Sequence, residues 1–170
     1  MATTLSGTLS IQSSVRFDSG SDVSTLVDIL SAPYSATYAD GTGANQANRI
    51  FRDRRTLAAS TSEELDLAGG ITDPYGTAIT MARVKAIIIV SAAANGDVIN
   101  VGGAAANAFA SWVGDATDKI VLRPGACFAL AATEATGYAV TAGTGDLLKI
   151  ENADSGDSAT YDIIIIGASA

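Results

Sequence analysis

Two runs of β-branched residues constrain the fold of this chain more than any other feature of its sequence. They are residues 84–90 (VKAIIIV) and 161–166 (YDIIII). Branching at Cβ restricts χ1 and suits a pleated surface better than a helix. An unbroken apolar run also suits a strand that is covered on both faces. We therefore expect these two segments to be central strands of one core.

Turn signals interrupt the chain at short intervals after residue 76. Clear examples are Pro124-Gly125, residues 143–145 (GTG) and residues 155–157 (SGD). A spacing of about 8 to 12 residues between turns is typical of a sandwich or barrel. The sequence therefore predicts an all-β fold, an antiparallel β-sandwich of jelly-roll type, over residues 49–170.

The strongest hairpin signal in this region is the dipeptide Asn95-Gly96. Asn-Gly favours the tight turns that join adjacent antiparallel strands. We therefore expect residues 97–101 to pair back onto residues 84–90.

Residues 1–48 are expected to form an extended N-terminal arm followed by a loop region. The apolar residues of the first part are odd-numbered: Leu5, Leu9, Ile11, Val15 and Phe17. Odd spacing places them on one face of a strand. Residues 24–30 (STLVDIL) are expected to be a strand or an irregular segment rather than a helix. The arm either caps its own domain or adds to the sheet of a neighbour, and both alternatives remain open.

The composition fits one domain with a surface that is poor in charge. The chain has 170 residues, of which 48% are hydrophobic and 16% are charged. This length allows one sizeable core. Such a sparsely charged surface is typical of β-rich extracellular or virion proteins, in which much of the exterior lies against neighbours.

The basic residues are concentrated in residues 49–55 (RIFRDRR), although the formal net charge is −8. This acidic balance argues against nucleic acid as a partner. One interpretation of the arginine cluster is a solvated strand edge. The other is a docking patch for an acidic protein surface, since Arg makes bidentate contacts with carboxylates.

The residue types present exclude most catalytic chemistry. The chain has no histidine and one cysteine, Cys127, so Ser-His-Asp, Cys-His and His-zinc sites cannot form within it. Cys127 lies among apolar neighbours and is expected to be a small buried residue. The acidic residues lie beside expected turns, as in residues 152–157 (NADSGD), which favours solvated turn aspartates over paired catalytic carboxylates or structural calcium. We expect no enzymatic activity, no cofactor and no metal.

Segments that direct a chain to a membrane are not expected. Residues 1–10 (MATTLSGTLS) lack a basic stretch followed by an apolar one, which is the pattern of a signal peptide. The sequence also has no apolar run near the roughly 20 residues that a membrane helix needs. We therefore expect a soluble product, made in the cytoplasm, without a membrane partner.

Several blocks of the sequence resemble a family of small virion structural proteins of tailed bacteriophages. The resemblance covers residues 40–170, and is carried by blocks such as 40–60 (DGTGANQANRIFRDRRTLAAS), 107–125 (NAFASWVGDATDKIVLRPG) and 161–170 (YDIIIIGASA). It implies a decoration, or cement, protein on the capsid exterior that stabilises the shell by binding the major capsid protein. It also implies self-association, as a trimer or dimer, and no catalytic residues.

A second function remains open beside capsid decoration: a tail, neck or head-fibre component that binds a glycan of the host surface. For either function, the residues expected to contact a partner are Arg49, Arg52, Arg54, Arg55, Leu5, Leu9 and Ile11. The residues expected in the core are Leu65, Leu67, Ile79, Val84, Ile87, Ile89, Val101, Trp112, Val121, Phe128, Leu130, Leu148, Ile150, Ile163 and Ile165.

Overall fold

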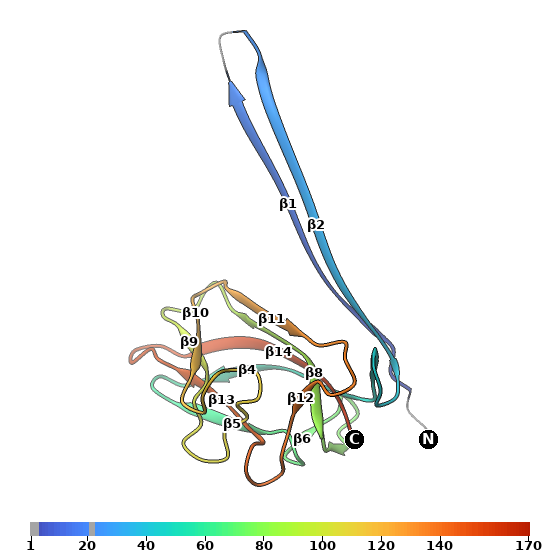
Figure 1. The fold of residues 1–170 in the computed structure, drawn as a ribbon. Helices are drawn as coiled ribbons and strands as arrows, with labels where there is room; N and C mark the ends of the chain where they lie inside the picture. The colour runs from blue at the N-terminus through green and yellow to red at the C-terminus, as the bar shows by residue number, and fades with distance from the viewer. Residues whose placement is uncertain (1–3, 21–22) are drawn as a thin grey trace.

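The protein consists of a β-sandwich and a long β-hairpin that projects away from it (Figure 1). The computed structural model describes residues 4–20 and 23–170. Within these residues every regular element is a strand, which confirms the predicted all-β fold. The hairpin consists of β1 (Gly7–Gly20) and β2 (Thr25–Asp40).

The sandwich is built from two packed sheets. Its strands are β4 (Arg49–Leu57), β5 (Ser62–Asp66), β8 (Arg83–Ser91), β9 (Ile99–Gly102), β10 (Lys119–Leu122), β11 (Cys127–Ala131), β13 (Leu147–Asn152) and β14 (Ala159–Ala168). The two-residue strand β12 (Tyr138–Ala139) also belongs to the sandwich, β3 (Gln46–Ala47) pairs with β2 of the hairpin, and β6 (Ile71–Thr72) and β7 (Ala78–Ile79) pair with each other.

The strand order is that of a jelly roll. One sheet has the order β11-β8-β14-β4, with β12 also paired to β8, and the other has the order β10-β9-β13-β5. The antiparallel pairs are nested along the chain: β9 with β10, β8 with β11, β5 with β13, and β4 with β14. A ribbon of such nested pairs, wrapped into two facing sheets, buries one face of every strand.

The two predicted central strands are β8 and β14, and they pair with each other in the middle of their sheet. Ile87 and Ile89 of β8, and Ile163 and Ile165 of β14, are at most 1% exposed. They pack against the second sheet, which contributes residues such as Leu148 to the same cluster. The prediction of central strands is therefore confirmed.

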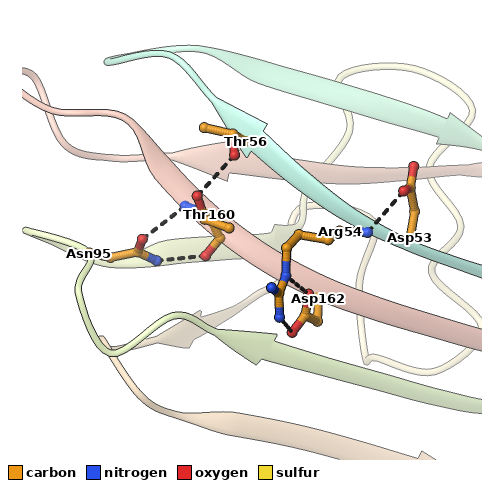
Figure 2. Close-up of polar contacts among 6 residues, drawn as sticks. All are labelled: Asp53, Arg54, Thr56, Asn95, Thr160 and Asp162. Carbon is orange, nitrogen blue, oxygen red and sulfur yellow. Dashed lines mark hydrogen bonds and ion pairs between the residues drawn. The ribbon is translucent and has the colours of Figure 1, made fainter.

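The predicted hairpin at Asn95-Gly96 is wrong. β9 pairs with β10 and β13 in the other sheet, so residues 92–98 cross between the sheets. The Asn95 side chain instead pairs with the backbone of Thr160: its Nδ2 donates to the carbonyl oxygen at 2.9 Å, and its Oδ1 accepts from the amide nitrogen at 2.8 Å (Figure 2). Asn95 thereby bonds to the start of β14 just beyond the end of β8.

Two predicted core positions are wrong. Val121 is 57% exposed, while its neighbour Leu122 is buried. Three consecutive apolar residues in an edge strand leave the inward face undetermined by alternation. Cys127 is also exposed, because it lies opposite Val90 on the outer face of the edge strand β11.

Most of the other predicted core residues are buried. Trp112, Phe128 and Leu130 are only partly buried and pack against the rim of the core. The rings of Trp112 and Phe128 lie 5.4 Å apart at a tilt of 50°. This is the offset geometry that aromatic pairs prefer.

The five-stranded sheet is also apolar on its outer face, the face turned away from the second sheet. Ala86 and Ile166 are buried there, and Ile50, Ile88 and Ile164 are partly buried. The first part of the hairpin covers these side chains with Leu9, Ala36 and Tyr38. This second, smaller core attaches the hairpin to the sandwich.

Candidate functional site

The hairpin is the candidate functional site. Its strands pair without interruption from Gly7↔Tyr38 to Gly20↔Thr25. Fourteen residues in β1, at about 3.3 Å per residue, give a hairpin about 45 Å long. Figure 1 shows that most of this length lies outside the sandwich. A two-stranded hairpin is at best marginally stable in water unless something packs on it.

The register gives the hairpin two different faces, because directly opposite residues in an antiparallel pair point to the same side. We call one the apolar face: it carries Leu9, Ile11, Ser13, Val15 and Phe17 of β1 opposite Ala36, Tyr34, Ala32, Leu30 and Asp28 of β2. We call the other the serine-rich face: it carries Thr8, Ser10, Gln12, Ser14, Arg16 and Asp18 opposite Thr37, Ser35, Pro33, Ser31, Ile29 and Val27.

The base of the hairpin is held on the sandwich by Tyr38 and Lys85. The Tyr38 hydroxyl donates to the carbonyl oxygen of Lys85 at 3.0 Å. Burial raises the pKa of Tyr38 to about 12. The buried Lys85 ammonium donates to the carbonyl oxygens of Gly43, Glu134 and Ala135, and burial lowers its pKa. The Lys85 charge and the Tyr38 hydroxyl are thus both hydrogen-bonded to backbone carbonyl oxygens. These bonds hold the loops around the base of the hairpin in place.

Beyond the base, none of the residues that the structure describes packs on the apolar face. Ile11, Val15 and Phe17 are 44%, 51% and 69% exposed, and Leu30 and Tyr34 are 57% and 45% exposed. Side chains of this size are rarely left in a contiguous exposed row on a protein that acts alone.

The distal end of the hairpin carries exposed apolar side chains on both faces. Val27 and Ile29 lie on the serine-rich face and are 46% and 65% exposed, and Val23 beside the turn is 94% exposed. Together with Phe17 on the apolar face, they give this end of the hairpin exposed apolar side chains on both faces. An end of this kind suits insertion into a partner rather than contact along one side.

The predicted arginine cluster does not form one patch. All four residues lie on β4, an edge strand, where alternation separates them between its faces. Arg54 is paired on the outer face with the Asp162 carboxylate through two bonds, of 2.6 and 2.7 Å (Figure 2), and this pair lowers the pKa of Asp162. Arg49 donates to the carbonyl oxygen of Asn48. Arg52 is exposed on the outer face, and its contact with a partner stays a prediction.

Arg55 belongs to a polar network at the rim of the sandwich. Its guanidinium bonds to the carboxylates of Glu63, at 2.6 Å, and Asp53, at 2.9 Å. The Tyr161 hydroxyl donates to Glu63 at 2.7 Å, and burial together with this bond raises the pKa of Tyr161. These contacts occupy Arg55 and are those of a structural ion pair.

The acidic loops use their carboxylates within turns. Asp154 accepts bonds from the amide nitrogens of Gly156 and Asp157, and Asp115 accepts from the amide and hydroxyl of Thr117. Among the described residues, no group of three or more His, Cys, Asp or Glu side chains could hold a metal ion.

The predicted partner residues of the arm are divided by the structure. Leu9 is buried and Leu5 is partly buried against the chain's own sandwich, whereas Ile11 is exposed. The pairing of β2 with β1 was not predicted from the sequence, and neither were the exposed Leu30, Tyr34 and apolar tip that follow from it. A signal was present: the odd-numbered apolar residues before residue 20 are mirrored by the even-numbered run Leu30, Ala32, Tyr34, Ala36 and Tyr38.

Comparisons with known proteins do not indicate a function for this chain. No protein-family model, curated protein or solved structure matches the chain. No helix long and apolar enough to cross a membrane occurs in residues 4–20 and 23–170.

Proposed function

We propose that this chain is a structural protein of a bacteriophage virion that decorates the capsid exterior and stabilises the shell. In this role it binds the major capsid protein through the distal end of the hairpin. It acts as a binding protein rather than an enzyme, and needs no nucleic acid, membrane or cofactor.

The observation that carries the proposal is the hairpin itself. It extends about 45 Å as a two-stranded ribbon, and its tip presents Phe17, Val23, Val27 and Ile29 to solvent. A ribbon that cannot be stable alone, ending in apolar residues on both faces, needs a protein surface to receive it. Such a device anchors the sandwich to a neighbouring protein.

Two further features support a capsid as that neighbour. The sequence blocks of residues 40–170 resemble small virion proteins of tailed bacteriophages, and jelly rolls are frequent in viral capsids. Neither feature alone assigns a function, since one fold serves many functions. On a shell, one modest contact per copy is repeated by symmetry, so the stabilisation accumulates over the particle.

The copy number of the chain in purified phage particles tests the proposal. We expect a ratio to the major capsid protein near one, or a simple fraction of one, when both are quantified by mass spectrometry against isotope-labelled peptides. Capsid symmetry repeats each binding site many times, which is the reason for this expectation. A total of only a few copies per particle would contradict decoration and favour the tail, neck or head-fibre function with glycan binding.

A further inference from the structure

Two apolar surfaces of this chain meet at the base of the hairpin. One is the apolar face of the hairpin. The other is the outer face of the five-stranded sheet, where Ile164 lies between Arg52 and Ile88, and where Val90 follows in the next row beside the Asp162–Arg54 ion pair. Ile88, Val90 and Ile164 are all partly exposed.

These two surfaces already pack on each other within one chain. Leu9 and Ala36 of the apolar face lie in one cluster with Ala86 and Ile166 of the sheet, and Ile88 and Ile164 pack against the edge of that cluster. The contact ends after Leu9. The apolar face continues along the hairpin, and the sheet continues toward Val90, without covering each other. Each copy of the chain therefore carries both an uncovered apolar ribbon and a sheet face of the kind that ribbon packs on.

Charge on the two surfaces is also complementary. Asp28 is the one carboxylate on the apolar face, opposite Phe17. Arg52 is on the outer face of the sheet, opposite Ile164. Neither side chain makes a hydrogen bond or ion pair with another described residue, whereas the nearby Arg16 and Arg54 are paired with Asp18 and Asp162.

We propose that a second copy of this chain covers the apolar face. The exposed part of the hairpin of one copy packs on the outer face of the five-stranded sheet of its neighbour, with Asp28 beside the neighbour's Arg52. The inference does not rest on the proposed role in a virion. It leaves Val23, Val27 and Ile29, at the tip and on the serine-rich face, for a different partner.

The size of this contact is adequate for a specific interface. Five side chains of the apolar face are 44% to 69% exposed, and a large side chain at this exposure contributes roughly 100 Å². With the sheet surface opposite, one contact then buries about 1,000 Å², which reaches the size of a specific interface. Interfaces between identical subunits are also the more apolar ones, as this surface requires.

The test is the oligomeric state of the purified protein, measured by sedimentation equilibrium without any other protein. We expect the wild type to be oligomeric at micromolar concentration. The double variant Val15→Ser with Leu30→Ser should raise the dissociation constant at least 100-fold. The matched variant Val27→Ser with Ile29→Ser, on the opposite face of the same part of the hairpin, should change it less than threefold. Equal effects of the two variants would overturn the assignment of the apolar face.

Charge reversal tests the pairing of the two surfaces with exposed residues that are not needed for folding. Asp28→Arg alone and Arg52→Asp alone should each weaken association at least tenfold, and their combination should restore it to within threefold of the wild type. Failure of the combination to recover would overturn the pairing. A wild type that is monomeric at 100 μM would overturn self-association. If the proposed virion function fails instead, the purified protein still associates but does not bind particles.

Discussion

Replacing residues 12–33 by the dipeptide Asn-Gly is expected to abolish binding to phage particles while the sandwich stays folded. Ile11 and Tyr34 are directly opposite each other, so a two-residue turn can join them and close a shorter hairpin. The change removes Val23, Val27 and Ile29, which form the proposed contact with the particle. Each residue of an interface hot spot contributes about 2 kcal/mol or more, so affinity should fall by at least about 100-fold.

The sandwich should tolerate this change, because Leu9, Ala36 and Tyr38 all lie outside the replaced segment and keep their contacts with the five-stranded sheet. Binding is measured by co-sedimentation with particles that lack the chain. Calorimetry of the shortened protein provides the control, with a melting temperature expected within about 4 °C of the wild type, which corresponds to less than about 1 kcal/mol. Undiminished binding by the shortened protein would show that the sandwich, not the hairpin, holds the particle.

Alkaline pH is expected to destabilise the protein through Tyr38. Its pKa is about 12 in the folded state and about 10 in the unfolded chain. A raised pKa in the folded state gives a stabilisation that is complete below pH 10 and lost as the pH rises to 12. The free energy of unfolding should therefore fall by about 1.4 kcal/mol per pH unit over this range, or about 2.7 kcal/mol in total, from Tyr38 alone.

The variant Tyr38→Phe isolates this contribution. The Lys85 carbonyl oxygen keeps a bond from the amide nitrogen of Ala132 at 2.7 Å, so loss of the hydroxyl leaves this acceptor paired. Two other groups also change the stability at alkaline pH. The raised pKa of Tyr161 adds a further loss of stability as the pH rises, whereas the lowered pKa of Lys85 adds a gain of stability as the pH rises toward the usual pKa of lysine. Both are present in the variant, so they cancel in the difference. Urea unfolding of both proteins at pH 9, 10, 11 and 12 measures the difference between their free energies of unfolding. A difference that does not change with pH would contradict the burial of Tyr38.

The central strands of the sandwich could be predicted because burial on both faces leaves an unambiguous mark on a sequence. Ile87, Ile89, Ile163 and Ile165 face the second sheet, while Ile88 and Ile164 face the hairpin base. Both faces therefore select β-branched residues, and an unbroken run results. The all-β class followed from these runs and from the spacing of the turns, whereas the strand order of the jelly roll did not, because alternation fixes which residues face inward better than which strands are neighbours.

Elements whose position depends on distant contacts were not predictable. Asn95-Gly96 has the chemistry of a hairpin turn, but the Asn95 amide is used by the backbone of Thr160, and the chain crosses to the other sheet. Val121 illustrates the same limit for alternation, since Val121 and Leu122 are equally apolar and only the pairing of β10 with β9 decides which one faces inward.

The candidate site was predictable only in part. The alternation of Leu9, Ile11, Val15 and Phe17 indicated a strand with one apolar face, but the matching alternation in β2 does not by itself identify β2 as the strand that pairs with it. The arginine cluster had the composition of a binding patch. Whether these arginines are free to bind a partner depends on side chains of β5 and β14 that pair with them, such as Glu63 and Asp162. Sequence spacing does not reveal these pairs.

The most direct test of the central claim is the identity of the protein that contacts the tip of the hairpin in the assembled particle. A photo-crosslinking residue is placed at Val23, which is 94% exposed, and a control is placed at Tyr75, which is 84% exposed in a loop of the sandwich. After irradiation and mass spectrometry, we expect Val23 to cross-link to the major capsid protein, and Tyr75 to give little or none of this product. Cross-links from Val23 only to tail or fibre proteins, or none above the level at Tyr75, would contradict the account.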